Sequence, residues 1–158
     1  MNLFRDRFRS ISLSIITAVC MSSCTNTPKD IHKDKEEIKK TLVQMWDAIE
    51  KEDIATYSNY IHPDFTQFGE FDEKLKIGKE IEVNGTQEWV NNSDNIHTEM
   101  IDPLVTVNGN VAWITYYWSD SGITGDQSFS SKGKSTRIFV RENNKWLCIH
   151  GHYTILPD

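Results

Sequence analysis

The chain has few cysteines and prolines, no surplus of positive charge, and no apolar run long enough to cross a bilayer as a helix. Its 158 residues include three cysteines and four prolines, and the formal net charge is -6. An acidic balance lacks the basic face that nucleic acid requires, so we expect no nucleic-acid partner.

What is present is typical of one soluble globular domain. The length suits a single domain, and 38% apolar with 25% charged residues is an ordinary composition. The five Trp, five Tyr and seven Phe supply enough aromatic area for a core, with some left to line a cavity.

The first residues are typical of a targeting segment. Three arginines precede a short apolar stretch at residues 11–21, and Ser22-Ser23-Cys24 follows it. This order resembles a bacterial lipobox, although Met21 stands where Leu is usual. We therefore expect a lipoprotein signal peptide at 1–23, lipidation of Cys24 and a tether at 24–34. An ordinary cleaved signal peptide or an uncleaved anchor is the alternative.

That interpretation places the protein in the bacterial cell envelope, anchored by lipid on the periplasmic or surface face. It also assigns the cysteines, because Cys20 leaves with the signal peptide and Cys24 carries the lipid. Only Cys148 then remains in the folded part. A lone cysteine makes no internal disulfide, so packing alone must hold the core.

Helical spacing dominates the first part of the chain. A helix ending near Lys51 is expected from its apolar positions, which are Ile38, Leu42, Met45, Trp46 and Ile49. Thr27-Pro28 could open it. Asp53 is a suitable N-cap for a second, short helix that stops before His62-Pro63. A third helix is expected to begin at Asn84-Gly85-Thr86.

Strand patterns dominate the remainder. We expect strands at 65–71, 97–107, 111–120, 135–141 and 145–156, with a bend at Asp102-Pro103. Asn108-Gly109 predicts a type I′ hairpin turn, and residues 142–144 a second turn. Gly122, Gly125 and Gly133 predict a loop. Helices followed by a meander indicate an α+β fold, with helices packed on one face of a curved antiparallel sheet.

Several segments resemble the association domain of calcium/calmodulin-dependent protein kinase II and the related SnoaL-like domains. They are Asn95–Thr98 leading into 101–107, the run Thr136-Arg137-Ile138-Phe139-Val140-Arg141, and Asn144-Lys145-Trp146 continuing to His150-Gly151-His152. Asp53 and the later His62-Pro63-Asp64-Phe65 look like the helix–helix–strand opening of the same nuclear transport factor 2-like superfamily. The resemblance covers about residues 35–156.

The resemblance implies a cone-shaped α+β domain over residues 35–158, dimeric through its sheet, with a pocket between sheet and helices. The superfamily contains isomerases, cyclases, dehydratases and non-catalytic assembly domains, so the fold alone does not determine the function. The tyrosine and aspartate of its steroid isomerases would fall near Met45 and Gly69. Neither residue can exchange a proton there, which argues against that activity.

Arg137 is the first candidate for a binding residue. It matches the strand arginine that faces the pocket in the kinase association domain, whose second pocket arginine falls near Trp118. A guanidinium in a partly apolar cavity binds a carboxylate through two parallel hydrogen bonds. The alternative is an ion pair at the surface or at a dimer interface.

Other candidates are less specific. His150 and His152 share a strand face with each other by alternation, and with Trp146 and Cys148. They could form an acid/base pair, ligate zinc or bond locally; zinc needs three or four ligands, so we expect no metal and no cofactor. Tyr60, Tyr116 and Trp118, with Trp46 and Trp89, could line a pocket or belong to the core.

The favoured hypothesis is an envelope-tethered, dimeric domain that binds a small anionic or polar-tipped apolar molecule. The alternative is a SnoaL-like isomerase, cyclase or hydratase using histidine or carboxylate acid/base chemistry. Its candidates would be His150, His152, Glu70 and Asp64. A purely structural role in assembly is a third hypothesis. A titratable side chain deep in the pocket would favour the enzyme.

Overall fold

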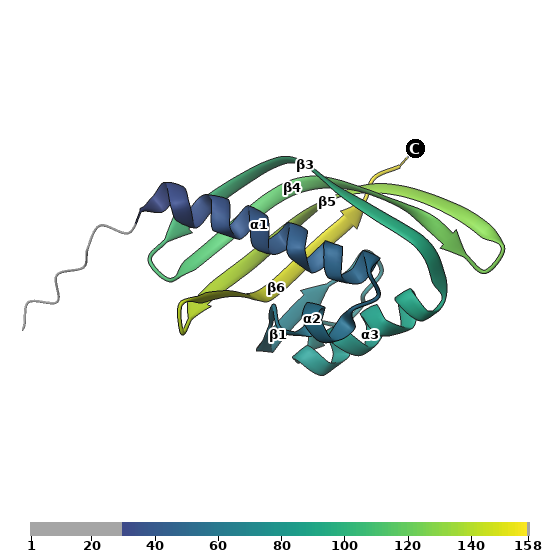
Figure 1. The fold of residues 1–158 in the computed structure, drawn as a ribbon, viewed down its shortest axis with the longest axis horizontal. Coiled ribbons are helices and arrows are strands. Elements are labelled where there is room, and N and C mark those ends of the chain that lie inside the picture. The colour runs from purple at the N-terminus through teal and green to yellow at the C-terminus, as the bar shows by residue number, and fades with distance from the viewer. Residues whose placement is uncertain (1–29, 158) are drawn as a thin grey trace, which may run out of the picture.

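The computed structural model describes residues 30–157, so the predicted signal peptide and Cys24 lie outside the described part. Three helices and six strands follow one another along this part (Figure 1). They are α1 (Ile31–Glu50), α2 (Ile54–Ser58), β1 (Ile61–Phe68), β2 (Lys76–Ile77), α3 (Lys79–Asn91), β3 (Ser93–Asn108), β4 (Val111–Thr124), β5 (Gln127–Glu142) and β6 (Lys145–Ile155). The predicted α+β class is confirmed.

The first two helices form for the expected reasons. The apolar positions of α1 lie on one stripe, and Ile38, Leu42 and Met45 on it are almost fully buried. The N-cap of α1 is Asp30, whose carboxylate accepts the backbone N–H groups of His32 and Lys33. The helix thus includes residues 31–34 of the segment expected as a tether. Asp53 caps α2 as predicted, accepting the Thr56 N–H at 2.9 Å.

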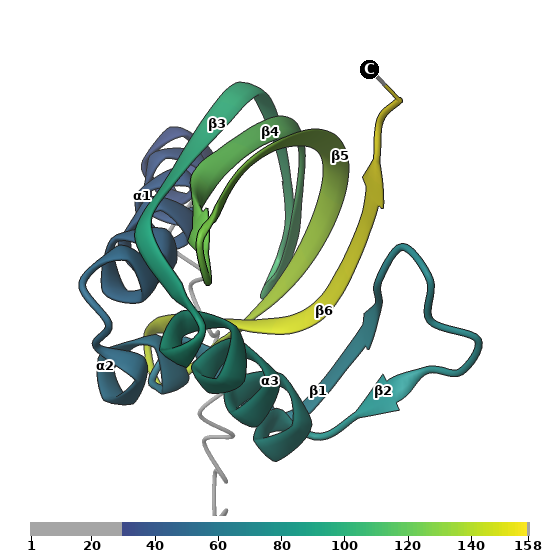
Figure 2. The same ribbon diagram turned by 90° about the vertical axis from the view of Figure 1, so that its right-hand side faces the viewer.

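One sheet contains all six strands, in the order β2-β1-β6-β5-β4-β3. The predicted antiparallel sheet has one exception, because β1 pairs with β6 in parallel. The sheet is strongly curved but remains open, with β2 and β3 at its two edges (Figure 2). The helices cover one of its faces, and the buried residues of α1 pack there against inward side chains of the sheet.

The predicted glycine-rich loop is wrong. β4 and β5 continue through it and reverse direction only at Gly125-Asp126, where Gly125 has φ +60°. Gly133 pairs with Trp118 across the strands, and a Cβ at 133 would lie 2.3 Å from the indole ring. Gly122 pairs with Phe129 in the same way. These strand glycines leave room for large cross-strand rings instead of ending the strands.

Two hairpin turns differ in type. Asn143 and Asn144 have φ values of 48° and 62°, which is the type I′ pattern, at the predicted turn. The first hairpin turns at Gly109 and Asn110, one residue later than predicted. Gly109 has φ 63° and Asn110 is not in the positive-φ region, the pattern of type II′.

The remaining boundaries shift by a few residues. α3 begins at Lys79 rather than near Asn84, with Gly85 in its interior. The first strand runs from Ile61 to Phe68, and the predicted bend in β3 is confirmed by a register shift between Ile101 and Leu104. Across residues 30–157 no helix has the length and apolarity to cross a membrane.

Candidate functional site: a cavity between helices and sheet

A cavity of about 500 Å³ lies between the helices and the covered face of the sheet. All three helices contribute to its lining, as do β1 and the inward side chains of β3 to β6. Its polar lining includes Tyr57, Gln67, Glu82, Asp120, Ser131 and Arg137. This volume is within the range of cavities that bind small organic molecules.

Aromatic rings form much of the wall. Trp46 packs edge-on against Tyr116 with ring centroids 5.5 Å apart, and Trp118 against Tyr153 at 6.3 Å. Tyr116 and Trp118 share the inward face of β4, whereas Tyr117 points outward, as alternation predicts. Two of the predicted pocket residues, Tyr116 and Trp118, therefore lie in the cavity, as do Trp46 and Trp89.

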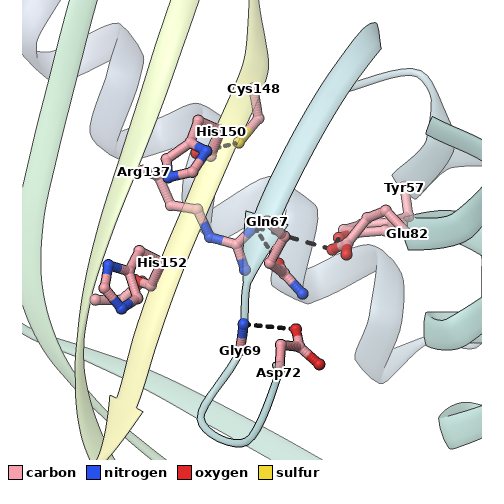
Figure 3. A network of polar contacts seen from close by, with 10 residues as sticks. Tyr57, Gln67, Gly69, Asp72, Glu82, Arg137, Cys148, His150 and His152 are labelled. Atoms are coloured by element: carbon pink, nitrogen blue, oxygen red, sulfur yellow. Dashed lines mark hydrogen bonds and ion pairs between the residues drawn. The ribbon is translucent and has the colours of Figure 1, made fainter. Parts of the chain in front are cut away.

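Arg137 also lies in the cavity, on the inward face of β5. Its cross-strand partner is Gly151 on β6, where a Cβ would lie 2.7 Å from Arg137 Nη1. The missing side chain at 151 thus gives the guanidinium its space. From β5 the side chain reaches toward Gln67 of β1 and Glu82 of α3 (Figure 3).

The contacts of the Arg137 guanidinium are long. Nη1 lies 3.5 Å from Gln67 Oε1 and 3.9 Å from Glu82 Oε1, and the buried Nε has no hydrogen-bond partner among the described residues. Burial disfavours the charged form, but Tyr116, Cys148, Tyr57 and Glu82 together raise the pKa of Arg137 well above its ordinary value. The guanidinium is therefore charged and incompletely bonded.

Tyr57 and Glu82 complete this polar group. The Tyr57 hydroxyl donates to Glu82 Oε1 at 2.6 Å, and both side chains are buried. Burial, and then the Glu82 carboxylate, raise the pKa of Tyr57 well above its usual value, so the hydroxyl keeps its proton at neutral pH. Sequence reasoning missed both residues, because no spacing rule joins a position on α2 to one on α3.

Asp120 is a further residue that sequence reasoning missed. It lines the cavity beside Ser131, and its buried Oδ1 has no partner within the described part of the chain. Burial raises its pKa, against hydrogen bonds from Ser131 that lower it. Asp120 is in phase with Tyr116 and Trp118 along β4, so alternation could have identified it. Asp120 and Glu82 are the carboxylates among the lining residues, so the kind of group that the enzymatic hypothesis requires is present, and a SnoaL-like enzyme remains the alternative to a binding domain.

His150 and His152 lie outside this cavity. Phe139 pairs with Cys148, but Ile138 pairs with His150, so a bulge at Ile149 reverses the alternation of β6. The histidines therefore do not share a face with Trp146 and Cys148, as simple alternation predicted.

The two histidines lie in different environments outside the cavity. His150 Nδ1 lies 2.8 Å from the Thr66 hydroxyl, and burial lowers the pKa of its ring. His152 lines a separate hollow on the outer face with Tyr117 and Thr136. Tyr60 also lies elsewhere, in a hollow beside Trp146 and Lys145. Sequence-based assignment of these three residues to the pocket is therefore not supported by the geometry.

No metal centre is visible in residues 30–157, where no three His, Cys, Asp or Glu side chains come together as a ligand set. Cys148 is fully buried, and burial raises the pKa of its thiol to about 11. The thiol is therefore protonated at neutral pH and a poor nucleophile.

A curved sheet that encloses an aromatic cavity with its helices defines a small α+β domain built around an internal pocket. The chain belongs to the SnoaL-like domain family, whose model matches residues 38–157.

Solved structures agree with that assignment. A nuclear transport factor 2-like protein from Streptomyces avermitilis, for which a dehydratase activity is suggested, is 17% identical with a TM-score of 0.73, over 80% of this chain and 99% of that one. The association domain of the Caenorhabditis elegans calcium/calmodulin-dependent kinase is 20% identical with a TM-score of 0.64, over 78% and 97%. A superfamily member from Salmonella enterica is 17% identical with a TM-score of 0.71, over 80% and 94%. At these identities the likeness shows the fold alone.

Proposed function

We propose that the cavity binds a small apolar molecule through a carboxylate that pairs with Arg137. The observation that carries the proposal is a charged guanidinium inside an aromatic cavity, with long contacts to Gln67 and Glu82 and an Nε that has no partner among the described residues. A carboxylate at a typical charge-assisted distance of about 2.8 Å would bond it better than Gln67 or Glu82 does. The low effective dielectric of such a site strengthens that attraction.

The wall supports an apolar, flat body for the ligand. Trp46 with Tyr116 and Trp118 with Tyr153 form edge-on pairs with interplanar angles of 62° and 77°, and Phe129 with Trp89 adds a tilted pair at 6.3 Å. Such walls favour aromatic molecules through edge and face contacts. We therefore expect aryl carboxylates to bind better than short aliphatic ones.

A thermal-shift comparison tests this function. Naphthoate and its uncharged amide would be compared on the wild type, Arg137→Lys and Arg137→Ala. We expect naphthoate alone to stabilise the wild type, with a smaller shift in Arg137→Lys because the planar fork is lost, and none in Arg137→Ala.

Arg141→Lys is the matched control. Arg141 lies on the same strand but pairs with Asp34 and stacks on Trp146, outside the cavity. That variant melts at a lower temperature but keeps the naphthoate response. Equal responses from the wild type and both Arg137 variants would show that Arg137 is structural.

We also infer a homodimer formed through the outer face of the sheet. Leu104 and Tyr117 are 68% and 51% exposed there, and Ile101 and Trp113 extend the same apolar surface. A patch of this kind in a monomer favours association. The fold shared with a kinase association domain supports this inference.

The tether and the envelope location remain our proposals from the sequence. The order of arginines, apolar stretch and Ser22-Ser23-Cys24 supports them. Replacing Cys24 with Ser should abolish incorporation of labelled palmitate and release the protein from the membrane fraction. If label and membrane association both persist in that variant, the lipidation proposal is wrong.

A further inference from the structure

Glu82 lies in the position where a ligand carboxylate would meet Arg137. Its Oε1 is 3.9 Å from Arg137 Nη1, both side chains line the cavity, and both are largely buried (Figure 3). A protein carboxylate is thus already beside the guanidinium. A ligand carboxylate entering the cavity meets both the attraction of Arg137 and the repulsion of Glu82.

The ion pair between Arg137 and Glu82 is longer than a charge-assisted hydrogen bond. Charge-assisted N–H···O bonds are typically about 2.7–2.9 Å, well below the separation of Arg137 and Glu82. The other cavity contact, to Gln67, is 3.5 Å, and Arg137 Nε has no partner within the described residues. The guanidinium can therefore exchange Glu82 for a closer carboxylate.

The Glu82 carboxylate accepts a hydrogen bond from a second donor, which remains when a ligand carboxylate pairs with Arg137. The Tyr57 hydroxyl donates to the same carboxylate at 2.6 Å, a short bond between buried groups. A buried carboxylate with no partner would be costly, so Tyr57 reduces the cost of separating Glu82 from Arg137.

The helix that carries Glu82, α3, has few buried side chains. Only Glu82 and Val90 of α3 are buried, and its N-cap, Gly78, has φ 100° and makes no side-chain capping bond. Glu82 also lies within the first turns of α3, close to that cap. A displacement of this end of the helix would disturb the packing of Val83 and the hydrogen bond from the Gly78 N–H to the Phe65 carbonyl, but would expose no buried side chain near the cap other than Glu82.

We propose that Glu82 is an internal competitor for Arg137, which a ligand carboxylate displaces and which Tyr57 then holds. The inference rests on the proposed carboxylate function and names the residue that sets its affinity and selectivity. Weakly acidic or neutral ligands cannot replace Glu82, so the cavity selects molecules with a fully ionised carboxylate.

The central test is the affinity of naphthoate for the full chain, measured by titration calorimetry. Glu82→Gln removes the competing charge at nearly constant volume, and we expect naphthoate to bind about tenfold more tightly, which corresponds to about 1.4 kcal/mol. Affinity for the uncharged amide should not change. Glu80→Gln, on the exposed side of the same helix, is the matched control and should leave both affinities unaltered.

Tyr57→Phe should act in the opposite direction. Without the hydroxyl, Glu82 depends on Arg137 alone, so naphthoate binding should weaken severalfold. In the double variant the effect of Tyr57→Phe should disappear, because no carboxylate remains for the hydroxyl to hold. A merely structural role for Tyr57 would lower the affinity equally in both backgrounds.

Two results overturn the inference in different ways. If naphthoate binding requires Arg137 but weakens in Glu82→Gln, Glu82 positions the guanidinium and does not compete with the ligand, while the carboxylate function stands. If naphthoate binds neither the wild type nor Glu82→Gln, both the inference and the proposed function fail. A melting curve for each variant confirms that it is folded.

Discussion

Asp120 combines partial burial with incomplete hydrogen bonding. The side chain lines the cavity and is paired across the strands with Ser131, and burial raises the pKa of its carboxyl group. A raised pKa means that the folded state binds this proton more tightly than the unfolded chain does. The contribution of Asp120 to stability is therefore fully present below the unfolded pKa of about 3.9 and is lost as the pH rises through the folded value.

Asp120→Asn makes this dependence measurable. The amide keeps the shape but does not titrate, so the stability of the wild type relative to the variant should fall as the pH rises from acidic to neutral. Urea unfolding of both proteins across that range gives the difference in free energy. A difference that stays constant, or that favours the wild type at higher pH, would contradict the raised pKa.

At the scale of elements, strand glycines shape the cavity. Gly133, Gly122 and Gly151 face Trp118, Phe129 and Arg137 across their strands, and a Cβ at each would collide with the opposite side chain. The large side chains therefore lie over backbone instead of over a neighbouring side chain. This arrangement gives the cavity its wall and the guanidinium its position.

Gly133→Ala and Gly85→Ala form a contrasting pair. A Cβ at 133 would lie 2.3 Å from Trp118, so we expect a loss of about 1–3 kcal/mol and a change in tryptophan fluorescence. Gly85 is in the interior of α3, where an added Cβ meets nothing within 4 Å. Gly85→Ala should stabilise the domain by about 0.4–1 kcal/mol. Equal effects in urea unfolding would refute this account.

Much of the fold could be predicted from periodicity and capping residues. The stripe of α1, the Asp53 cap and the turn at Asn143-Asn144 depend on local chemistry, and all three were correct. The placement of Arg137 in the pocket came from the family resemblance. Such features need no knowledge of distant parts of the chain.

The remaining features depend on pairing between strands or helices. The bulge at Ile149 is defined only by the register of β6 against β5, and it moves His150 and His152 to the outer face. From the sequence alone, Gly133 suggests a loop. Only its pairing with Trp118 on the neighbouring strand shows that it lies inside a strand. The Tyr57–Glu82 contact joins two helices, which a linear pattern cannot reveal.

At the scale of the whole molecule, the two faces of the sheet differ in chemistry. The covered face holds the cavity, and the outer face exposes Ile101, Leu104, Trp113 and Tyr117. Burying such residues against a second copy would stabilise a dimer by about 25 cal/mol for each Å² removed from water. The proposed ligand site and the proposed dimer interface therefore lie on opposite faces of the sheet.

Light scattering on a fragment covering residues 30–158 tests the dimer. We expect a dimer at micromolar concentration, and Tyr117→Lys should shift it toward monomer. Phe71→Ser is the matched control, since Phe71 is 85% exposed but lies between β1 and β2, away from the outer-face patch. A monomeric wild type, or dissociation by Phe71→Ser alone, would count against this interface.

The most direct test of the account is the dissociation constant of naphthoate for the wild type and Arg137→Lys, measured by calorimetry at constant pH. The two proteins carry the same charge and differ in the planar fork that can hold a carboxylate through two bonds. The account predicts that the lysine variant binds naphthoate about tenfold more weakly, with no change for the uncharged amide. Identical dissociation constants for the two proteins would contradict it.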